Sequence, residues 1–167
     1  AQAVIEVLGQ FVARQAAEVV THDDALGQRF VHGHGQTPAQ LGQPDQQQAQ
    51  PRLGVSRGDL AKLKGKVKHL FHLGAVYDLE ASAEEMHTAN IVGTESALAF
   101  ASAVNAGCFH LVSSIAAAGL YRGTFTEDMF EEAEELDHPY HSTKHASEGL
   151  VRANGRIPFR IYRPGAV

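Results

Sequence analysis

Hydrophobic residues beyond position 50 alternate between short apolar runs and longer stretches with helical spacing. Residues 67–73 and 109–113 are short runs rich in apolar residues and are predicted to be strands, and a further short strand is expected within 156–164. In 84–106 and 139–154, apolar residues recur every three or four positions, which predicts helices. Strands that alternate with helices predict an α/β fold built on a parallel sheet.

The first 50 residues have a different pattern from the rest. All eleven glutamines lie at or before Gln50, while all five lysines lie after it. Residues 3–20 have apolar residues at near-helical spacing and are expected to form a helix, whereas 27–50 are rich in Gly, Pro, Gln and His and are expected to be loop or disordered. We therefore divide the chain into an atypical Gln-rich segment, 1–50, and a domain-forming part, 51–167.

Composition narrows the classes of function. With 44% hydrophobic and 20% charged residues, the 167-residue chain is typical of one soluble domain. It has no apolar run of 18 residues and no recognisable signal peptide, so we expect no membrane association. A net charge of −5 argues against nucleic acid as a partner. The single Cys108 excludes an internal disulfide and fits a cytoplasmic location.

A tyrosine and a lysine four residues apart carry the clearest chemistry. In a helix over 139–154, Tyr140 and Lys144 lie on one face, one turn apart. An ammonium within about 4 to 6 Å of a phenol favours the phenolate, so such a tyrosine can exchange protons. Ser114 lies at the end of a predicted strand and could hydrogen-bond the same substrate oxygen. On the other side of this helix, Ala146, Leu150 and Ala153 are expected to face the sheet.

The order Ser113-Ser114, Gly119, then Tyr140-x-x-x-Lys144 resembles the extended branch of the short-chain dehydrogenase/reductase superfamily. The resemblance implies a Rossmann-like, doubly wound parallel sheet that binds NAD or NADP. It implies that Tyr140 is the catalytic acid/base, that Lys144 supports it and holds ribose hydroxyls, and that Ser114 polarises the substrate oxygen. The serine five residues before the glycine has this role in the family, which selects Ser114 over Ser113.

Further landmarks of the same resemblance lie in register along 51–167. Asn90, followed by Gly93, matches an asparagine that braces the active site, and we assign it a supporting catalytic role. The remaining matches are assigned to the cofactor: His72, Leu73, Gly74 and Ala75 along the ribose, Arg163 and Pro164 beside the nicotinamide, and Ser113 with them.

The sequence of residues 120–128 is similar to that of the fatty acyl-CoA reductase and thioester reductase-like group. This implies a small-molecule substrate, an acyl thioester or aldehyde, and slightly favours NADP over NAD. Relatives pair through helices corresponding to 86–106 and 139–154, so a homodimer is also an expectation.

One expected feature is missing. Members of this branch begin with a strand, a Gly-x-x-Gly-x-x-Gly turn and a helix that hold the pyrophosphate, and nothing in 1–50 matches this. We expect that 1–50 is not native to the fold, that the first strands and the C-terminal substrate region are missing, and that 51–167 is the central part of a Rossmann-type domain. The alternative to an enzyme is a truncated or frame-disrupted fragment with weak cofactor binding.

Three other motifs have two interpretations each. His138, His141 and His145 have the spacing of zinc ligands on a helix, but the glutamate of the zinc-protease motif is absent, so we assign no metal. Asp59-Leu60 resembles an adenine-contacting pair, but 59–65 is better explained as a short helix. The acidic stretch 120–137 is either a solvated loop or a lid near the substrate entrance.

Overall fold

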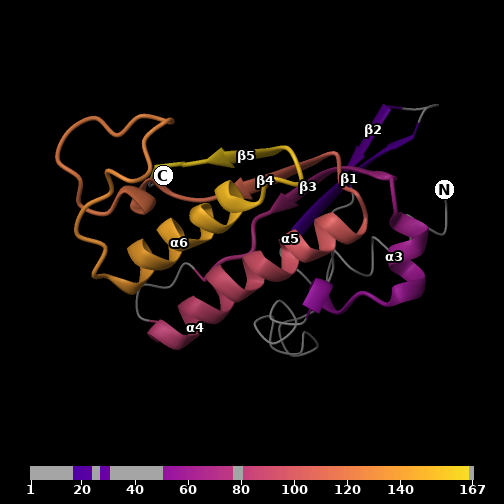
Figure 1. Cartoon of the computed structure of the whole chain (residues 1–167), viewed down its shortest axis with the longest axis horizontal. Coiled ribbons are helices and arrows are strands. Elements are labelled where there is room, and N and C mark those ends of the chain that lie inside the picture. The colour runs from indigo at the N-terminus through magenta and orange to yellow at the C-terminus, as the bar shows by residue number, and fades with distance from the viewer. Residues whose placement is uncertain (1–16, 24–26, 31–50, 77–80, 166–167) are drawn as a thin grey trace.

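The computed structural model describes residues 17–23, 27–30, 51–76 and 81–165. Five strands form one sheet in the order β2-β1-β3-β4-β5 (Figure 1). Their bounds are Ala17–Asp23 (β1), Gly27–Phe30 (β2), Val67–His72 (β3), Cys108–Val112 (β4) and Phe159–Tyr162 (β5). Strands β3, β4 and β5 are parallel to one another, which confirms the predicted α/β class and its parallel sheet.

Helices connect these parallel strands. The helical segments are η1 (Pro51–Gly54), α3 (Arg57–Leu63), α4 (Ala83–His87), η2 (Thr88–Val92), α5 (Gly93–Ala103), η3 (Ile115–Ala118) and α6 (Pro139–Ala153). Helices α5 and α6 lie side by side below the parallel strands (Figure 1). The core between helices and sheet includes Leu70 and Phe109 from the strands, Phe100 and Val151 from the helices, and Val104 directly after α5, all fully buried.

The predicted helix over 84–106 is present as three joined segments, α4, the wide π turn η2 and α5, and it ends at Ala103. Helix α3 confirms the helical interpretation of the region around Asp59, since Ser56 caps it by accepting a hydrogen bond from the Asp59 N–H at 3.2 Å. None of the helices in the described ranges is long and apolar enough to cross a membrane.

The expectations for the N-terminal segment were wrong where the structure describes it. Residues 17–20, expected in a helix, belong to β1, and 27–30, expected in a loop, form β2. Strand β1 is antiparallel to both β2 and β3. The β-branched run Val19-Val20-Thr21 favours an extended chain, and pairing with the edge of β3 outweighs the helical spacing of the apolar residues. The rest of both expectations, at 3–16 and 31–50, lies outside the described residues.

Candidate active site

A cavity of about 520 Å³ lies at the carboxyl ends of β3 and β4, between η3 and the start of α6. Ligands bind in this position in open α/β sheets. Seven of the residues that the sequence assigned to catalysis or to the cofactor line it: Leu73, Ala75, Ser113, Ser114, Tyr140, Lys144 and Pro164. The structure therefore brings the serine, the tyrosine and the lysine to one cavity.

Ser114 follows β4 and caps the short helix η3. Its hydroxyl oxygen accepts a hydrogen bond from the Ala116 N–H at 3.1 Å. Ser114 is thus a helix cap and at the same time lines the cavity. Because the capping bond uses the oxygen as acceptor, the hydroxyl proton is left for an oxygen in the cavity.

The backbone conformation of Gly119 explains why a glycine stands five residues after Ser114. Its φ of +66° and ψ of −133° are open to glycine and strained for other residues. A Cβ at this position would lie 1.8 Å from the carbonyl oxygen of Glu134. The same carbonyl accepts a hydrogen bond from the Leu120 N–H at 2.8 Å, which holds the acidic segment against the cavity wall.

Tyr140 and Lys144 come from the first turns of α6. Pro139 occupies the first turn of this helix, and the His138 side chain caps it by accepting a hydrogen bond from the Tyr140 N–H. The Lys144 Nζ lies 5.9 Å from the centre of the Tyr140 ring. Tyr140 and Lys144 are 6% and 5% exposed, so the pair occupies the interior wall of the cavity.

Burial lowers the pKa of Lys144 to about 8, although the carboxylate of Glu148, one turn further along α6, opposes this shift. The lysine is therefore mainly charged at neutral pH, but it loses its proton more readily than an exposed lysine does. An ammonium of this kind is a strong electrostatic partner for negative charge that develops in the cavity.

Replacing Lys144 with methionine should stabilise the fold at pH 7. The folded-state pKa of about 8 lies below the ordinary lysine value of 10.5, so below pH 8 both states are protonated and the buried charge destabilises the fold fully. Between pH 8 and 10.5 the folded state gives up its proton first, and stability rises with pH by at most about 3 kcal/mol. Urea unfolding at pH 7 and pH 10.5 should show this rise in the parent chain and lack it in Lys144→Met.

Lys62→Met is the matched control, because the Lys62 side chain is 56% exposed on α3. The control should keep the rise with pH. An equal rise in Lys144→Met and in the parent chain would contradict the burial of a charged lysine.

Asn90 lies in the wide turn η2 and is 2% exposed. Its side-chain oxygen accepts a hydrogen bond from the Val76 N–H, and its side-chain nitrogen donates to the Thr143 hydroxyl, each at 3.0 Å. It joins the loop after β3 to the residue before Lys144. The side chain does not line the cavity, so its part is to position these two walls.

His72 faces the helices rather than the cavity. The Thr94 hydroxyl donates to the Asn90 carbonyl at 2.7 Å, so it can only accept from the His72 Nε2, 3.0 Å away. Burial lowers the pKa of His72 to about 4, helped by the Lys144 charge, so this histidine is neutral. Neither His72 nor Gly74 lines the cavity, whereas Leu73 and Ala75 do.

Ser113 is the best indication that a polar ligand belongs in this cavity. It lines the cavity and is 4% exposed, yet its hydroxyl has no hydrogen-bond partner in the described part of the chain. A buried hydroxyl without a partner is unfavourable, so a ligand with a matching polar atom would gain free energy there. Together with the small side chain of Ala75, this fits the ribose of a nicotinamide cofactor close to the backbone.

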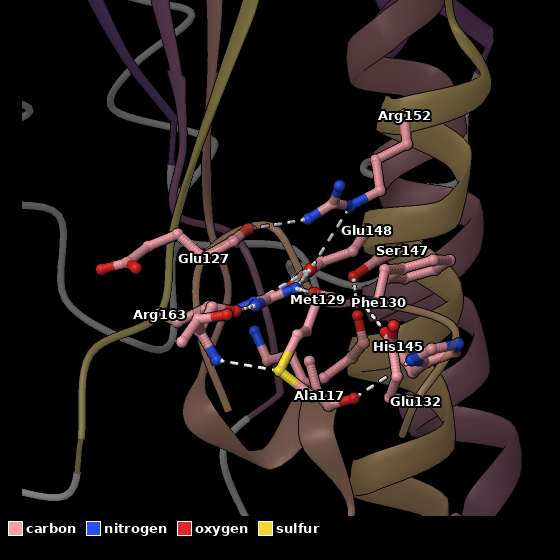
Figure 2. A network of polar contacts seen from close by, with 12 residues as sticks. Ala117, Glu127, Met129, Phe130, Glu132, His145, Ser147, Glu148, Arg152 and Arg163 are labelled. Carbon is pink, nitrogen blue, oxygen red and sulfur yellow. Dashed lines mark hydrogen bonds and ion pairs between the residues drawn. The ribbon is translucent and has the colours of Figure 1, made fainter. Parts of the chain in front are cut away.

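Arg163 does not line the cavity. Its side chain belongs to a network of polar contacts with Glu148 and Met129 (Figure 2). Its guanidinium donates to both carboxylate oxygens of Glu148, at 2.7 to 3.2 Å, and to the backbone carbonyls of Thr126 and Met129. Glu148 is 0% exposed. This buried pair ties the strand β5 and the acidic segment to α6, a role that the sequence does not reveal because Glu148 looks like an ordinary helical glutamate.

The acidic segment is held to the outer face of α6. The Phe130 ring stacks on the His145 ring of α6, with 4.1 Å between the ring centres (Figure 2). The guanidinium of Arg152, also on α6, lies 4.9 Å from the centre of the Phe130 ring. Phe130 also approaches Gly149, where a Cβ would lie 3.3 Å from the ring. The acidic segment thus packs against the rest of the domain. Leu120 at its start and Gly119 directly before it line the cavity.

Two of the three spaced histidines, His138 and His145, are used in other contacts, whereas the buried Nδ1 of His141 has no hydrogen-bond partner in the described part of the chain. His138 caps α6, the His145 Nδ1 lies 3.1 Å from the Ala117 carbonyl, and His141 lines the cavity. His141 and Ile115 are cavity residues that sequence reasoning missed. Both could have been found from the sequence, because Ile115 directly follows Ser114 and His141 directly follows Tyr140.

Comparisons with known proteins show which protein family the chain resembles. A family model described as male sterility protein, an NAD-binding domain, matches residues 47–167. A linear gramicidin synthase chain from Brevibacillus parabrevis is 34% identical over 70% of this chain.

Solved structures agree with these sequence matches. The terminal R domain from the myxalamid PKS-NRPS biosynthetic pathway is 29% identical over 71% of the chain, with a TM-score of 0.62. UDP-glucuronic acid 4-epimerase from Bacillus cereus, solved with NAD, is 25% identical over 70%, with a TM-score of 0.55. These neighbours confirm the predicted Rossmann-like fold. The chain spans 2% of the gramicidin synthase chain, 32% of the R domain chain and 37% of the epimerase chain.

Proposed function

Because this chain belongs to the male sterility protein family of NAD-binding domains, within the extended short-chain dehydrogenases, we propose that it is the catalytic core of an NAD(P)-dependent reductase acting on an acyl thioester or aldehyde. The observation that carries the proposal is the convergence of Ser114, Tyr140 and Lys144 on one cavity. The whole enzyme is longer than this chain in each relative compared, so the proposal concerns the chemistry of this cavity.

The chain's own residues supply position and a proton. Ser114 donates a hydrogen bond to the carbonyl oxygen of the substrate, which polarises the carbonyl bond. Tyr140 transfers its phenolic proton to that oxygen as negative charge develops there. The Lys144 ammonium stabilises the phenolate left behind and, by the family resemblance, holds the ribose hydroxyls of the cofactor.

When bound, reduced NAD(P) supplies the hydride that adds to the carbonyl carbon. For an aldehyde, this hydride and the proton from Tyr140 give the alcohol. For a thioester, the carbon–sulfur bond then breaks, the thiol leaves with a proton and an aldehyde is released. We assign Ser113, Leu73, Ala75 and Pro164 to the nicotinamide and ribose, and we favour NADP slightly over NAD on the resemblance of 120–128.

The rim of the cavity supports an acyl substrate. Ile115 and Leu120 are 56% and 55% exposed, and both line the cavity. Exposed apolar side chains that gather at a cavity mark a ligand surface. An alkyl chain would cover them, whereas a sugar nucleotide would leave them in contact with polar groups.

The test is NADPH oxidation with a fatty aldehyde and with an acyl-CoA, comparing the parent chain with Tyr140→Phe. Loss of the phenolic proton should lower kcat by about 10² to 10⁴-fold, the usual contribution of a general acid, with little change in NADPH affinity. Affinity is measured separately by the fluorescence of bound NADPH. UDP-glucuronic acid with NAD serves as the comparison substrate and should give no turnover.

The two measurements separate the proposal from the non-catalytic alternative. NADPH binding with turnover that disappears in Tyr140→Phe supports the reductase. Turnover that survives in Tyr140→Phe would overturn the role of Tyr140, and failure to bind NADPH would support the inactive-fragment interpretation.

A further inference from the structure

The opposite face of the sheet carries a second group of reactive side chains. Side chains alternate between faces along a strand, so His69 on β3 and Cys108 and His110 on β4 lie on the face away from the core residues Leu70 and Phe109. His69 is the register partner of Cys108. The three ligand atoms of this His–Cys–His group lie within 4.8 Å of one another.

The two imidazole rings are tilted by 52° to one another, with 5.1 Å between their centres. The His69 Nδ1 lies 2.9 Å from the His110 Nε2, and the other nitrogen of His110 lies 2.9 Å from the Tyr162 hydroxyl on β5. When the phenol oxygen accepts the Nδ1 proton of His110, its Nε2 carries the lone pair. An oxygen that fixes the tautomer from behind the ring in this way is typical of metal-binding histidines.

We propose that His69, Cys108 and His110 form a binding site for a borderline-soft divalent cation, Zn²⁺ above all, on the sheet face opposite α5 and α6. Two imidazoles and a thiolate are the ligands that zinc prefers, and three protein ligands leave its fourth tetrahedral position to water. Zinc–nitrogen bonds of about 2.0 to 2.1 Å place two tetrahedral ligand nitrogens about 3.3 Å apart, so the histidine pair needs to open by only a few tenths of an ångström.

The charged side chain of Arg160 acts on the group. Burial lowers the pKa of His110, with the neighbouring His69 and Arg160 charges as further causes. Burial raises the pKa of the Cys108 thiol, and Arg160 opposes that shift. Cation binding therefore displaces the thiol proton into solvent, and the exposed Arg160 side chain can move away from the added charge.

This site is separate from the proposed reductase chemistry. None of its three ligands lines the cavity described above, which lies beyond the carboxyl ends of the same strands. A bound cation would link β3 to β4 by bonds that do not depend on the cofactor. Its expected effect is on stability, because an ion that binds only the folded chain shifts the folding equilibrium toward it.

The test is titration of the metal-free full chain with Co²⁺, followed by displacement with Zn²⁺. Because Cys108 is the chain's single cysteine, a thiolate-to-cobalt charge-transfer band can come from one residue only. We expect one equivalent to bind with such a band. Cys108→Ser should remove the band and His69→Asn should weaken binding by at least about tenfold, and Tyr162→Phe should weaken it by about 10- to 100-fold.

His87→Ala is the control, since His87 is an exposed histidine on α4 and its loss should leave the titration unchanged. A second measurement needs no variant: Zn²⁺ should slow alkylation of Cys108 by iodoacetamide at least about tenfold in the parent chain. Absence of the charge-transfer band, or an alkylation rate that Zn²⁺ leaves unchanged, would overturn the proposal.

Discussion

Gly119→Ala is expected to destabilise the domain by about 3 kcal/mol or more. The new Cβ would lie 1.8 Å from the Glu134 carbonyl oxygen, at a φ of +66° that disfavours side chains. Relief requires separating the acidic segment from η3, which also opens the cavity wall. Urea unfolding measures the stability, and binding of NADPH by fluorescence should weaken in parallel.

Gly58→Ala is the matched control. Gly58 lies in helix α3, and a Cβ added there would lie 3.8 Å from its nearest neighbour, the Ser56 hydroxyl oxygen, which is an ordinary contact. This change should stabilise the chain by about 0.5 to 1 kcal/mol, because alanine favours the helix. A Gly119→Ala variant as stable as the parent chain would contradict the close approach of Gly119 to Glu134.

Arg163→Leu is expected to destabilise the domain by about 3 to 5 kcal/mol, because it leaves the fully buried Glu148 carboxylate without its main partner. It also removes the hydrogen bonds that hold the carbonyls of Thr126 and Met129 (Figure 2). The acidic segment should then become accessible to protease, a readout that a general loss of stability at another position would not share. Urea unfolding and limited proteolysis check the two effects.

Arg152→Leu is the control for charge, since its Nε lies 3.9 Å from Glu148 and its side chain is 29% exposed. Its effect should be within about 1 kcal/mol. The double variant Glu148→Leu with Arg163→Leu should recover part of the lost stability, because it removes both buried charges. A loss of less than about 1 kcal/mol in Arg163→Leu alone would show that the pair is not needed to neutralise Glu148.

Local spacing in the sequence was sufficient to predict that Ser114, Tyr140 and Lys144 lie at one cavity. Tyr140 and Lys144 share a helix face whatever the helix packs against, and Ser114 follows a strand whose carboxyl end points at the same edge of the sheet. Asn90 was assigned a bracing part, and its two hydrogen bonds are of that kind. The positions of Tyr140, Lys144 and Ser114 depend on short-range order, which the sequence encodes directly, whereas the part given to Asn90 came from the family resemblance.

The face of α6 shows where such reasoning fails. Ala146, Leu150 and Ala153 were expected to face the sheet, yet Ala153 is exposed, whereas Ser147 and Glu148 are buried. Ser147 is satisfied by the Lys144 carbonyl and Glu148 by Arg163, 15 residues away. Polarity alone predicts the wrong face when buried polar groups have partners that are distant in sequence.

Contacts between strands were also beyond the sequence. His69 and His110 are 41 residues apart, and only the parallel pairing of β3 with β4 places their nitrogens within 2.9 Å. Strand β1 was not predicted for a related reason. The spacing of its apolar residues fits a helix, and only the pairing with β3 makes it a strand. Register and pairing decide such features, and they are properties of the fold.

The most direct test of the central claim is a double-mutant cycle on kcat for aldehyde reduction with Ser114→Ala and Tyr140→Phe. If both side chains act on the same carbonyl oxygen, Ser114→Ala should lower kcat by about 10² to 10³-fold in the parent chain but add little in the Tyr140→Phe background. Effects that multiply fully, or a Ser114→Ala variant that retains the parent kcat, would contradict a shared oxygen.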